Sequence, residues 1–160
     1  MTYALLNKAE KDCWLPQLFD LFYRNMNTIA PSGMSYEEER AEWLSAVSPA
    51  LDKAPRQILL CCEDGKLAGY IQYYTRGDLL MIEELQLAAI YQRSTVFFSL
   101  VRALVRLLPE GIRYVEAFAD SRNRRSIALM KKLGMEILEE TEFVHLRGDA
   151  GAIWSFFYHA

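Results

Sequence analysis

The stretch of sequence that decides the fold is Ile82-Glu-Glu-Leu-Gln-Leu-Ala-Ala-Ile-Tyr-Gln-Arg93, read together with Asn123-Arg-Arg-Ser-Ile-Ala-Leu-Met-Lys-Lys-Leu-Gly-Met135. The first segment is an apolar strand with two adjacent glutamates, and it leads into a polar turn before a helix. The second has a polar start, a short amphipathic helix and a glycine stop. With the strand expected between them, they predict a strand-helix-strand crossover in the middle of the chain.

The remaining periodicity predicts one α/β domain over residues 1–160, with a mixed sheet that is antiparallel at its start. Two N-terminal helices precede the sheet, and a C-terminal hairpin closes it. We expect helices at 14–26, 35–47, 95–108 and 123–133, strands at 58–63, 67–75, 79–88 and 112–119, and a closing hairpin of 136–146 with 152–159. Ser35 and Glu38 form a predicted capping box.

Composition excludes several classes of protein. The chain has 160 residues, 52% of them apolar and 24% charged, with a net charge of −3. This balance is typical of a soluble globular protein and argues against nucleic acid as the main partner. No apolar run is long enough for a membrane span, and the start lacks the pattern of a signal peptide. Cys13, Cys61 and Cys62 have no metal-ligand spacing, so we expect buried reduced thiols, no metal and a cytoplasmic location.

The two opening segments resemble the signature segments of the GNAT superfamily of N-acetyltransferases, and the match covers about Ile58 to His159. The resemblance implies acetyl-CoA as the cofactor. It also implies that the backbone of Leu87 to Ala89 meets the pantetheine arm. The turn Q/R-x-x-G-x-G/A would then wrap the pyrophosphate. This chain departs from that turn at two positions. Thr95 stands where the pattern has glycine, and Phe97 stands where it has glycine or alanine.

The resemblance places cofactor contacts on both segments. The residues implied are Leu85, Gln86, Leu87, Ala88, Gln92, Arg93, Ser94, Thr95, Val96, Phe97, Asn123, Arg125, Ser126 and Met130. Arg122, Arg124 and Arg125 are candidates for the CoA phosphates, with solvated surface arginines as the alternative. The tyrosine that serves many members as general acid would fall at Met130, which cannot donate a proton.

Amine acetylation needs a base that takes a proton from the attacking nitrogen. Glu83 and Glu84 are the candidates, and strand alternation predicts that they point to opposite faces. We expect Glu83 to be the base, with Glu84 or neither residue as the alternative. Glu83, Tyr36 and Tyr73 are candidate contacts for the acceptor, and the acidic, aromatic segment around Tyr36 suits a cationic amine.

Three functions remain open on the sequence. The first is an acetyl-CoA-dependent N-acetyltransferase that acts on a small-molecule or peptide amine. The second is a catalytically silent acyl-CoA-binding or regulatory module, which the altered turn and Met130 favour. The third is a domain for protein association through the aromatic segment Ile153–Tyr158. The sequence leaves the acceptor and the oligomeric state open, a homodimer included.

Overall fold

A computed structural model describes residues 1–53, 55–92 and 94–159 of the chain. Its helices are α1 (Lys11–Ile29), α2 (Tyr36–Leu51), α3 (Val96–Leu107), α4 (Arg124–Lys132) and α5 (Ala150–His159), with short 3-10 turns at Lys8–Glu10 and Ala89–Tyr91. Its strands are β1 (Thr2–Leu5), β2 (Gln57–Glu63), β3 (Lys66–Arg76), β4 (Leu79–Leu87), β5 (Tyr114–Asp120), β6 (Glu136–Glu140) and β7 (Phe143–Asp149). The predicted α/β mixed sheet with two N-terminal helices is confirmed.

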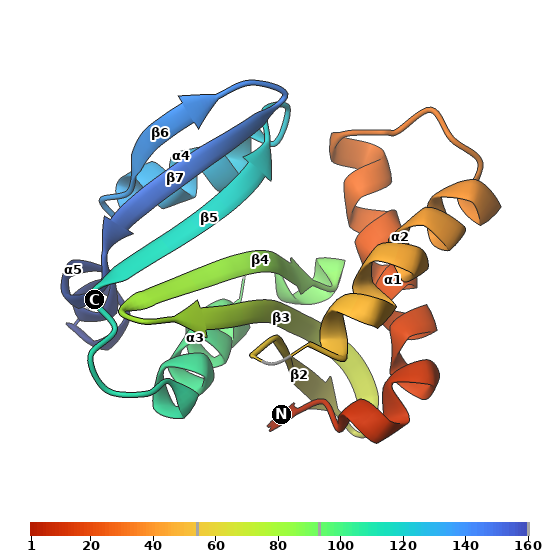
Figure 1. Ribbon diagram of the computed structural model, residues 1–160, viewed down its shortest axis with the longest axis horizontal. Coiled ribbons are helices and arrows are strands. Elements are labelled where there is room, and N and C mark those ends of the chain that lie inside the picture. Colours follow the sequence, from red (N-terminus) through yellow and green to blue (C-terminus); the bar gives the residue numbers. More distant parts are fainter. Residues whose placement is uncertain (54, 93, 160) are drawn as a thin grey trace.

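The described strands form one sheet in the order β1-β2-β3-β4-β5-β7-β6. Every neighbouring pair is antiparallel except β4 and β5, which are parallel. Residues 79–82 of β4 pair with residues 114–117 of β5, and beyond these residues both strands continue without pairing to each other. Figure 1 shows the result, with β4 and β5 touching at one end and diverging at the other. The sheet therefore opens in its middle.

The two N-terminal helices cover one face of the sheet. Ser35 begins α2, and its hydroxyl oxygen accepts a hydrogen bond from the Glu38 N–H at 3.2 Å, as the predicted cap requires. Leu18 and Phe19 of α1 are fully buried against residues of α2 and against Tyr70 of β3. This packing fixes α1 and α2 beside the opening between β4 and β5 (Figure 1).

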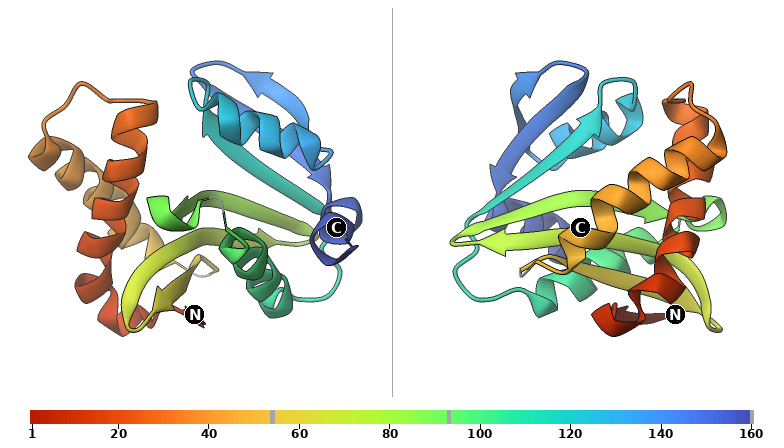
Figure 2. Two further views of the ribbon diagram at one scale, coloured as in Figure 1. Left: turned by 180° about the vertical axis from the view of Figure 1, so that it is seen from behind. Right: turned by 45° about the vertical axis from the view of Figure 1, so that its right-hand side comes forward.

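The opposite face of the sheet carries α3, α4 and α5, and the left view of Figure 2 shows α3 and α4 in front of the strands. In α3, which matches the helix predicted at 95–108, Leu100, Val101 and Leu104 form the inward face and are buried. Cys61 lies in the core on this side, while Cys62 packs toward α1 and α2, so the two thiols point to opposite faces of the sheet. Cys13 is exposed, contrary to the prediction of a buried thiol.

The C-terminal hairpin differs from the prediction in its strands. It is formed by β6 and β7, and residues 152–159, predicted as a strand, belong to helix α5. The Asp149 carboxylate accepts a hydrogen bond from the Ala152 N–H at 2.8 Å and so caps this helix. Ala150, Ile153 and Phe157 are buried at helical spacing. The core contacts of this face override the β-preference of the aromatic residues in the segment.

Candidate active site

A β-bulge lies in β4 where the sheet opens. Glu84 is paired with Gln72 of β3 and Ile82 with Tyr73, so Glu83 is an extra residue without a partner on β3. A bulge of this kind interrupts the alternation of side chains along a strand. The two adjacent glutamates therefore do not obey the simple rule that neighbours point to opposite faces.

Both glutamates lie on the face that carries α1 and α2, which corrects the prediction of opposite faces. Glu84 accepts a hydrogen bond from the Tyr70 hydroxyl at 2.7 Å. Glu83 is paired with Arg56, whose guanidinium lies 4.9 Å from the centre of the Tyr74 ring. Tyr70 and Tyr74 are four residues apart on the regular strand β3, so they share a face. The bulge thus brings two carboxylates to one side of the opening.

The two carboxylates differ in their environment. Arg56 holds Glu83 with two hydrogen bonds of 2.9 and 3.1 Å, which occupy both carboxylate oxygens. Glu84 accepts bonds from uncharged groups, the Tyr70 hydroxyl and, at 3.4 Å, the Gln86 amide. Burial raises the pKa of Glu84 from 4.5 to about 7, and these hydrogen bonds oppose the rise without cancelling it. Glu84 is therefore the carboxylate able to exchange a proton near neutral pH.

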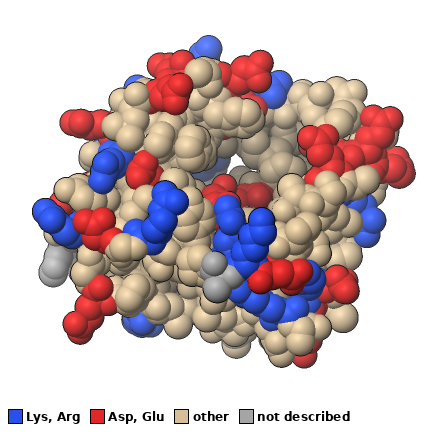
Figure 3. All heavy atoms as spheres, viewed as in Figure 1, with Lys and Arg blue, Asp and Glu red and all other residues tan. Residues whose placement is uncertain are grey.

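A cavity of about 670 Å³ occupies the opening of the sheet. Figure 3 shows the hollow near the centre of the molecular surface in this view, with acidic side chains visible inside it. Its walls come from α1 and α2, from Ile82–Gln86 of β4, from β5, and from the helices on the opposite face. The cavity thus reaches from one side of the sheet to the other, and Glu83 and Glu84 line it between the two sides.

The structure brings only some of the sequence-predicted residues to this cavity. Those on its wall are Glu83, Glu84, Leu85, Gln86, Phe97, Asn123, Ser126 and Met130. The others lie off the wall among the described residues: Leu87, Ala88, Gln92, Ser94, Thr95, Val96, Arg125, Tyr36 and Tyr73. Tyr73 is buried in the core, and Tyr36 donates a hydrogen bond to Asp20. Arg93 lies outside the described residues.

The backbone that is open toward β5 lies earlier in β4 than predicted. The Leu87 carbonyl already accepts bonds from the side-chain amides of Asn25 at 2.9 Å and Gln92 at 3.1 Å. The Ala88 N–H donates to the Ala68 carbonyl. Beyond Ile82, β4 has no strand partner on its β5 side within the described residues. This edge, residues 83–86, suits the amides of a pantetheine arm, which pairs with an open strand.

The start of α3 also fits a phosphate group. The helix begins at Val96, whose N–H donates to the Ser94 hydroxyl at 3.2 Å, and the N–H groups of Phe97 and Phe98 have no acceptor within the helix. The Phe97 ring packs 5.5 Å from the centre of the Phe157 ring, on the core side of the helix. The Phe97 side chain therefore lies on the core face of α3. With the ring in this position, the larger residue does not cover the N–H groups at the helix start.

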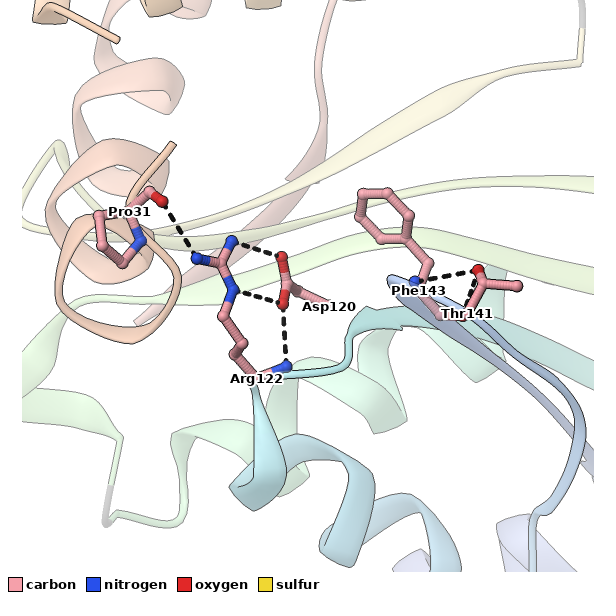
Figure 4. Close-up of polar contacts among 5 residues, drawn as sticks. All are labelled: Pro31, Asp120, Arg122, Thr141 and Phe143. Atoms are coloured by element: carbon pink, nitrogen blue, oxygen red, sulfur yellow. Dashed lines mark hydrogen bonds and ion pairs between the residues drawn. The ribbon is translucent and has the colours of Figure 1, made fainter. Parts of the chain in front are cut away.

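Arg122 has a role that the sequence did not reveal. It holds both oxygens of Asp120 at 3.1 Å, and it donates at 3.1 Å to the carbonyl of Pro31 in the α1–α2 loop (Figure 4). This pairing lowers the pKa of Asp120. Arg122 thus links the turn after β5 to the α1–α2 loop at the edge of the cavity, and its use for CoA phosphates stays a prediction.

Comparisons with known proteins agree with this architecture. The sequence model of the Acetyltransferase (GNAT) family matches residues 15–135. Among solved structures, the chain is similar to the PaiA N-acetyltransferase of Thermoplasma acidophilum in complex with coenzyme A, at 12% identity over 93% of this chain and 99% of that one, with a TM-score of 0.70. No curated protein matches the chain.

Two further structures share the fold. An acetyltransferase from Thermus thermophilus is 14% identical over 93% of this chain and 97% of that one, with a TM-score of 0.68. The aminoglycoside 6'-acetyltransferase type Ii is 14% identical with the same coverage and a TM-score of 0.66. The chain belongs to the acetyltransferase (GNAT) family, whose cofactor is acetyl-CoA.

Within the described residues, none of the helices has the length and apolar character that a membrane crossing requires.

Proposed function

We propose that the chain is an N-acetyltransferase that acylates a primary amine, with Glu84 as the general base. The observation that carries this assignment is the position of Glu84, a carboxylate on the cavity wall with a pKa of about 7 at the place where β4 and β5 part. The likeness to an aminoglycoside acetyltransferase adds support for an amine acceptor. Arg56 and Glu83 form a fixed ion pair beside this base.

Different residues of the chain bind the cofactor and transfer the proton. When bound, acetyl-CoA supplies the acetyl group as a thioester. The β4 edge at 83–86 would hold the pantetheine arm, and the start of α3 would hold the phosphates. Glu84 takes a proton from the amine nitrogen as that nitrogen becomes bonded to the acetyl carbon. Tyr70 and Gln86 stabilise the carboxylate before the transfer.

The described lining of the cavity contains no tyrosine or cysteine that could protonate the departing sulfur, and Met130 stands at the family's tyrosine position. A thiol has an ordinary pKa of about 8.5, so a thiolate leaves without an enzymatic acid at little cost near neutral pH. The missing tyrosine is therefore compatible with turnover.

The decisive experiment compares Glu84→Gln with Glu83→Gln in steady-state acetylation of an amine panel at pH 7. General base catalysis supplies about 10²–10⁴-fold, so Glu84→Gln is expected to lower kcat by at least about 10²-fold and to leave the Kd for acetyl-CoA nearly unchanged. Glu83→Gln is expected to have a smaller effect. The opposite ranking would transfer the role of base to Glu83, and full activity in both variants would refute a carboxylate base.

A silent acyl-CoA-binding module is the second candidate, because Thr95 and Phe97 replace the small residues of the cofactor turn and Met130 replaces the tyrosine. Thermal unfolding with acetyl-CoA, together with thiol release, separates the two functions. Ligand at ~100 times its Kd adds roughly 2.7 kcal/mol of stability. Stabilisation without thiol release from any amine in the panel would favour the silent module.

A further inference from the structure

Large apolar side chains are exposed on the wall of the cavity. Phe118 is 48% exposed, Phe143 55%, Met34 37% and Leu129 36%, and all four line the cavity. Scattered apolar residues on a surface are ordinary, but several gathered around one cavity indicate a binding surface. These residues come from β5, the start of β7, the α1–α2 loop and α4, so they converge from distant parts of the chain.

The Phe118 ring is held in a fixed orientation. It stacks on the His145 ring with 4.3 Å between the ring centres and 15° between the planes. His145 is fixed in turn, because its ring nitrogen lies 2.6 Å from the Glu116 carboxylate. One face of the Phe118 ring is thus covered, and the ring remains about half exposed. A rigid aromatic surface of this kind binds another apolar group at little cost in conformational entropy.

The wall on the other side of the cavity is also aromatic. Phe22 of α1 and Trp43 of α2 both line it, with their ring centres 6.2 Å apart. Trp43 is 9% exposed and therefore contributes a firmly packed surface. The cavity that contains Glu84 accordingly has aromatic groups on both of its sides.

The charges on the wall favour a cation. Apart from Arg122, the charged residues among its described lining are acidic: Glu39, Glu42, Glu83, Glu84 and Asp120. Arg122 is paired with Asp120, and Glu83 is paired with Arg56. No ion pair of Glu39 or Glu42 occurs within the described residues. A carboxylate on the substrate would therefore meet uncompensated negative charge and no available cation.

We propose that the acceptor is a small primary amine with an aromatic or bulky apolar group and without a carboxylate next to the amine. This inference rests on the proposed function and specifies its substrate class. The apolar group packs on the exposed aromatic residues, and Glu39 and Glu42 attract the ammonium form before Glu84 receives a proton. Matched amines separate the two contributions, because the ring and the carboxylate can be varied one at a time.

The test measures kcat/KM with acetyl-CoA for phenethylamine, ethylamine, phenylalanine, 1,4-diaminobutane and a short peptide with N-terminal phenylalanine. Apolar contacts in a pocket discriminate between substrates by about 10-fold or more. The kcat/KM for phenethylamine is therefore expected to exceed that for ethylamine by at least this factor. It is also expected to exceed that for phenylalanine by about 10-fold, since like charges across a site disfavour binding. A preference for ethylamine, phenylalanine, the diamine or the peptide would overturn the inference.

Variants connect the preference to the named residues. Phe118→Ala is expected to lower kcat/KM for phenethylamine by about 10-fold and to lower it less for ethylamine. Leu138→Ala is the matched control, because Leu138 is 53% exposed and does not line the cavity. Glu42→Gln should lower the ratio of kcat/KM for phenethylamine to kcat/KM for phenylalanine. Glu37→Gln, on the same helix, should leave this ratio unchanged. Equal effects of test and control variants would contradict the assignment.

Failure of this inference is distinguishable from failure of the proposed function. If acetyl-CoA stabilises the protein but no amine is acetylated, the proposed function fails and the inference fails with it. If another amine of the panel is the better substrate, the enzyme remains an N-acetyltransferase and only the acceptor class is refuted.

Discussion

Arg122 donates a hydrogen bond to the backbone carbonyl of Pro31, 91 positions earlier in the chain, while its remaining donors hold Asp120. One guanidinium therefore joins the loop between α1 and α2 to the turn between β5 and α4. These two segments belong to opposite sides of the opening in the sheet (Figure 1). Their connection fixes the α1–α2 loop, where Met34 meets the cavity, relative to the wall formed by β5.

Removing this bridge is expected to loosen the α1–α2 loop and to weaken amine binding. We expect Arg122→Ala to raise KM for the amine by about 3–10-fold, because preorganised contacts lose part of their value when a segment must be ordered on binding. Limited proteolysis should cleave the loop faster, with the Kd for acetyl-CoA changed little. Arg106→Ala, an exposed arginine at the end of α3, is the control. Unchanged KM and unchanged proteolysis would show that the bridge has no such role.

The raised pKa of Glu84 makes folding stability depend on pH. The folded protein keeps this proton up to about pH 7, whereas the unfolded chain loses it near 4.5. The stability associated with Glu84 is therefore fully present below about pH 4.5 and is lost as the pH rises through 7. Glu84→Gln removes this loss. Relative to the parent protein, the variant is expected to gain up to about 3 kcal/mol between pH 5 and pH 8.

Urea unfolding of the parent and of Glu84→Gln at the two pH values measures this difference. Glu110→Gln, a substitution in the exposed turn before β5, is the control and should show no comparable change. A stability difference between Glu84→Gln and the parent that is the same at pH 5 and pH 8 would contradict an elevated pKa for Glu84.

Tyr70 controls the ionisation of Glu84 through its hydroxyl. Because this hydrogen bond favours the charged carboxylate, Tyr70→Phe should raise the pKa of Glu84 further. The acidic limb of kcat/KM is then expected to move to higher pH. A hydrogen bond to a charged group is worth about 1.5–3 kcal/mol, so stability at pH 8 should fall by that order. Tyr74→Phe removes the hydroxyl from the ring beside Arg56 and should leave the limb in place. A limb that does not move in Tyr70→Phe would refute the coupling.

Local sequence signals predicted most of the fold correctly. Ser35 and Glu38 marked the start of α2, and Gly134 has the left-handed conformation expected after α4, with φ of 92°. In the helix predicted at 95–108, the apolar spacing of Leu100, Val101 and Leu104 matches the buried face of α3. In each case the deciding interaction is within one helix or between a helix and the sheet, so its pattern is written in neighbouring residues.

The errors arose where a distant segment decides the conformation. The bulge at Glu83 depends on the register between β3 and β4, so the side on which the two glutamates lie cannot be obtained from alternation in β4 alone. The last segment contained a usable signal, since Asp149 precedes Ala150, Ile153 and Phe157 at helical spacing. The bridge from Arg122 to Pro31 left no signal, because its acceptor is a backbone carbonyl.

Phe97 is the remaining departure from the family pattern, and its position leads to a prediction about stability rather than affinity. The ring lies 5.5 Å from the centre of the Phe157 ring and 5.8 Å from that of Phe98, in an aromatic cluster between α3 and α5. Removing a buried phenylalanine costs about 3–5 kcal/mol. We expect Phe97→Ala to lower the free energy of unfolding by an amount below this range, because the ring is partly exposed.

The Kd for acetyl-CoA should change by less than about 3-fold, because phosphate binding uses backbone N–H groups. Phe97→Leu retains most of the apolar volume and is the companion variant if the alanine protein does not fold. Urea unfolding and calorimetry on the three proteins measure both quantities. Tighter binding of acetyl-CoA by about 10-fold in either variant would show that the ring obstructs the phosphate site, and the helix start would then no longer fit the cofactor as described.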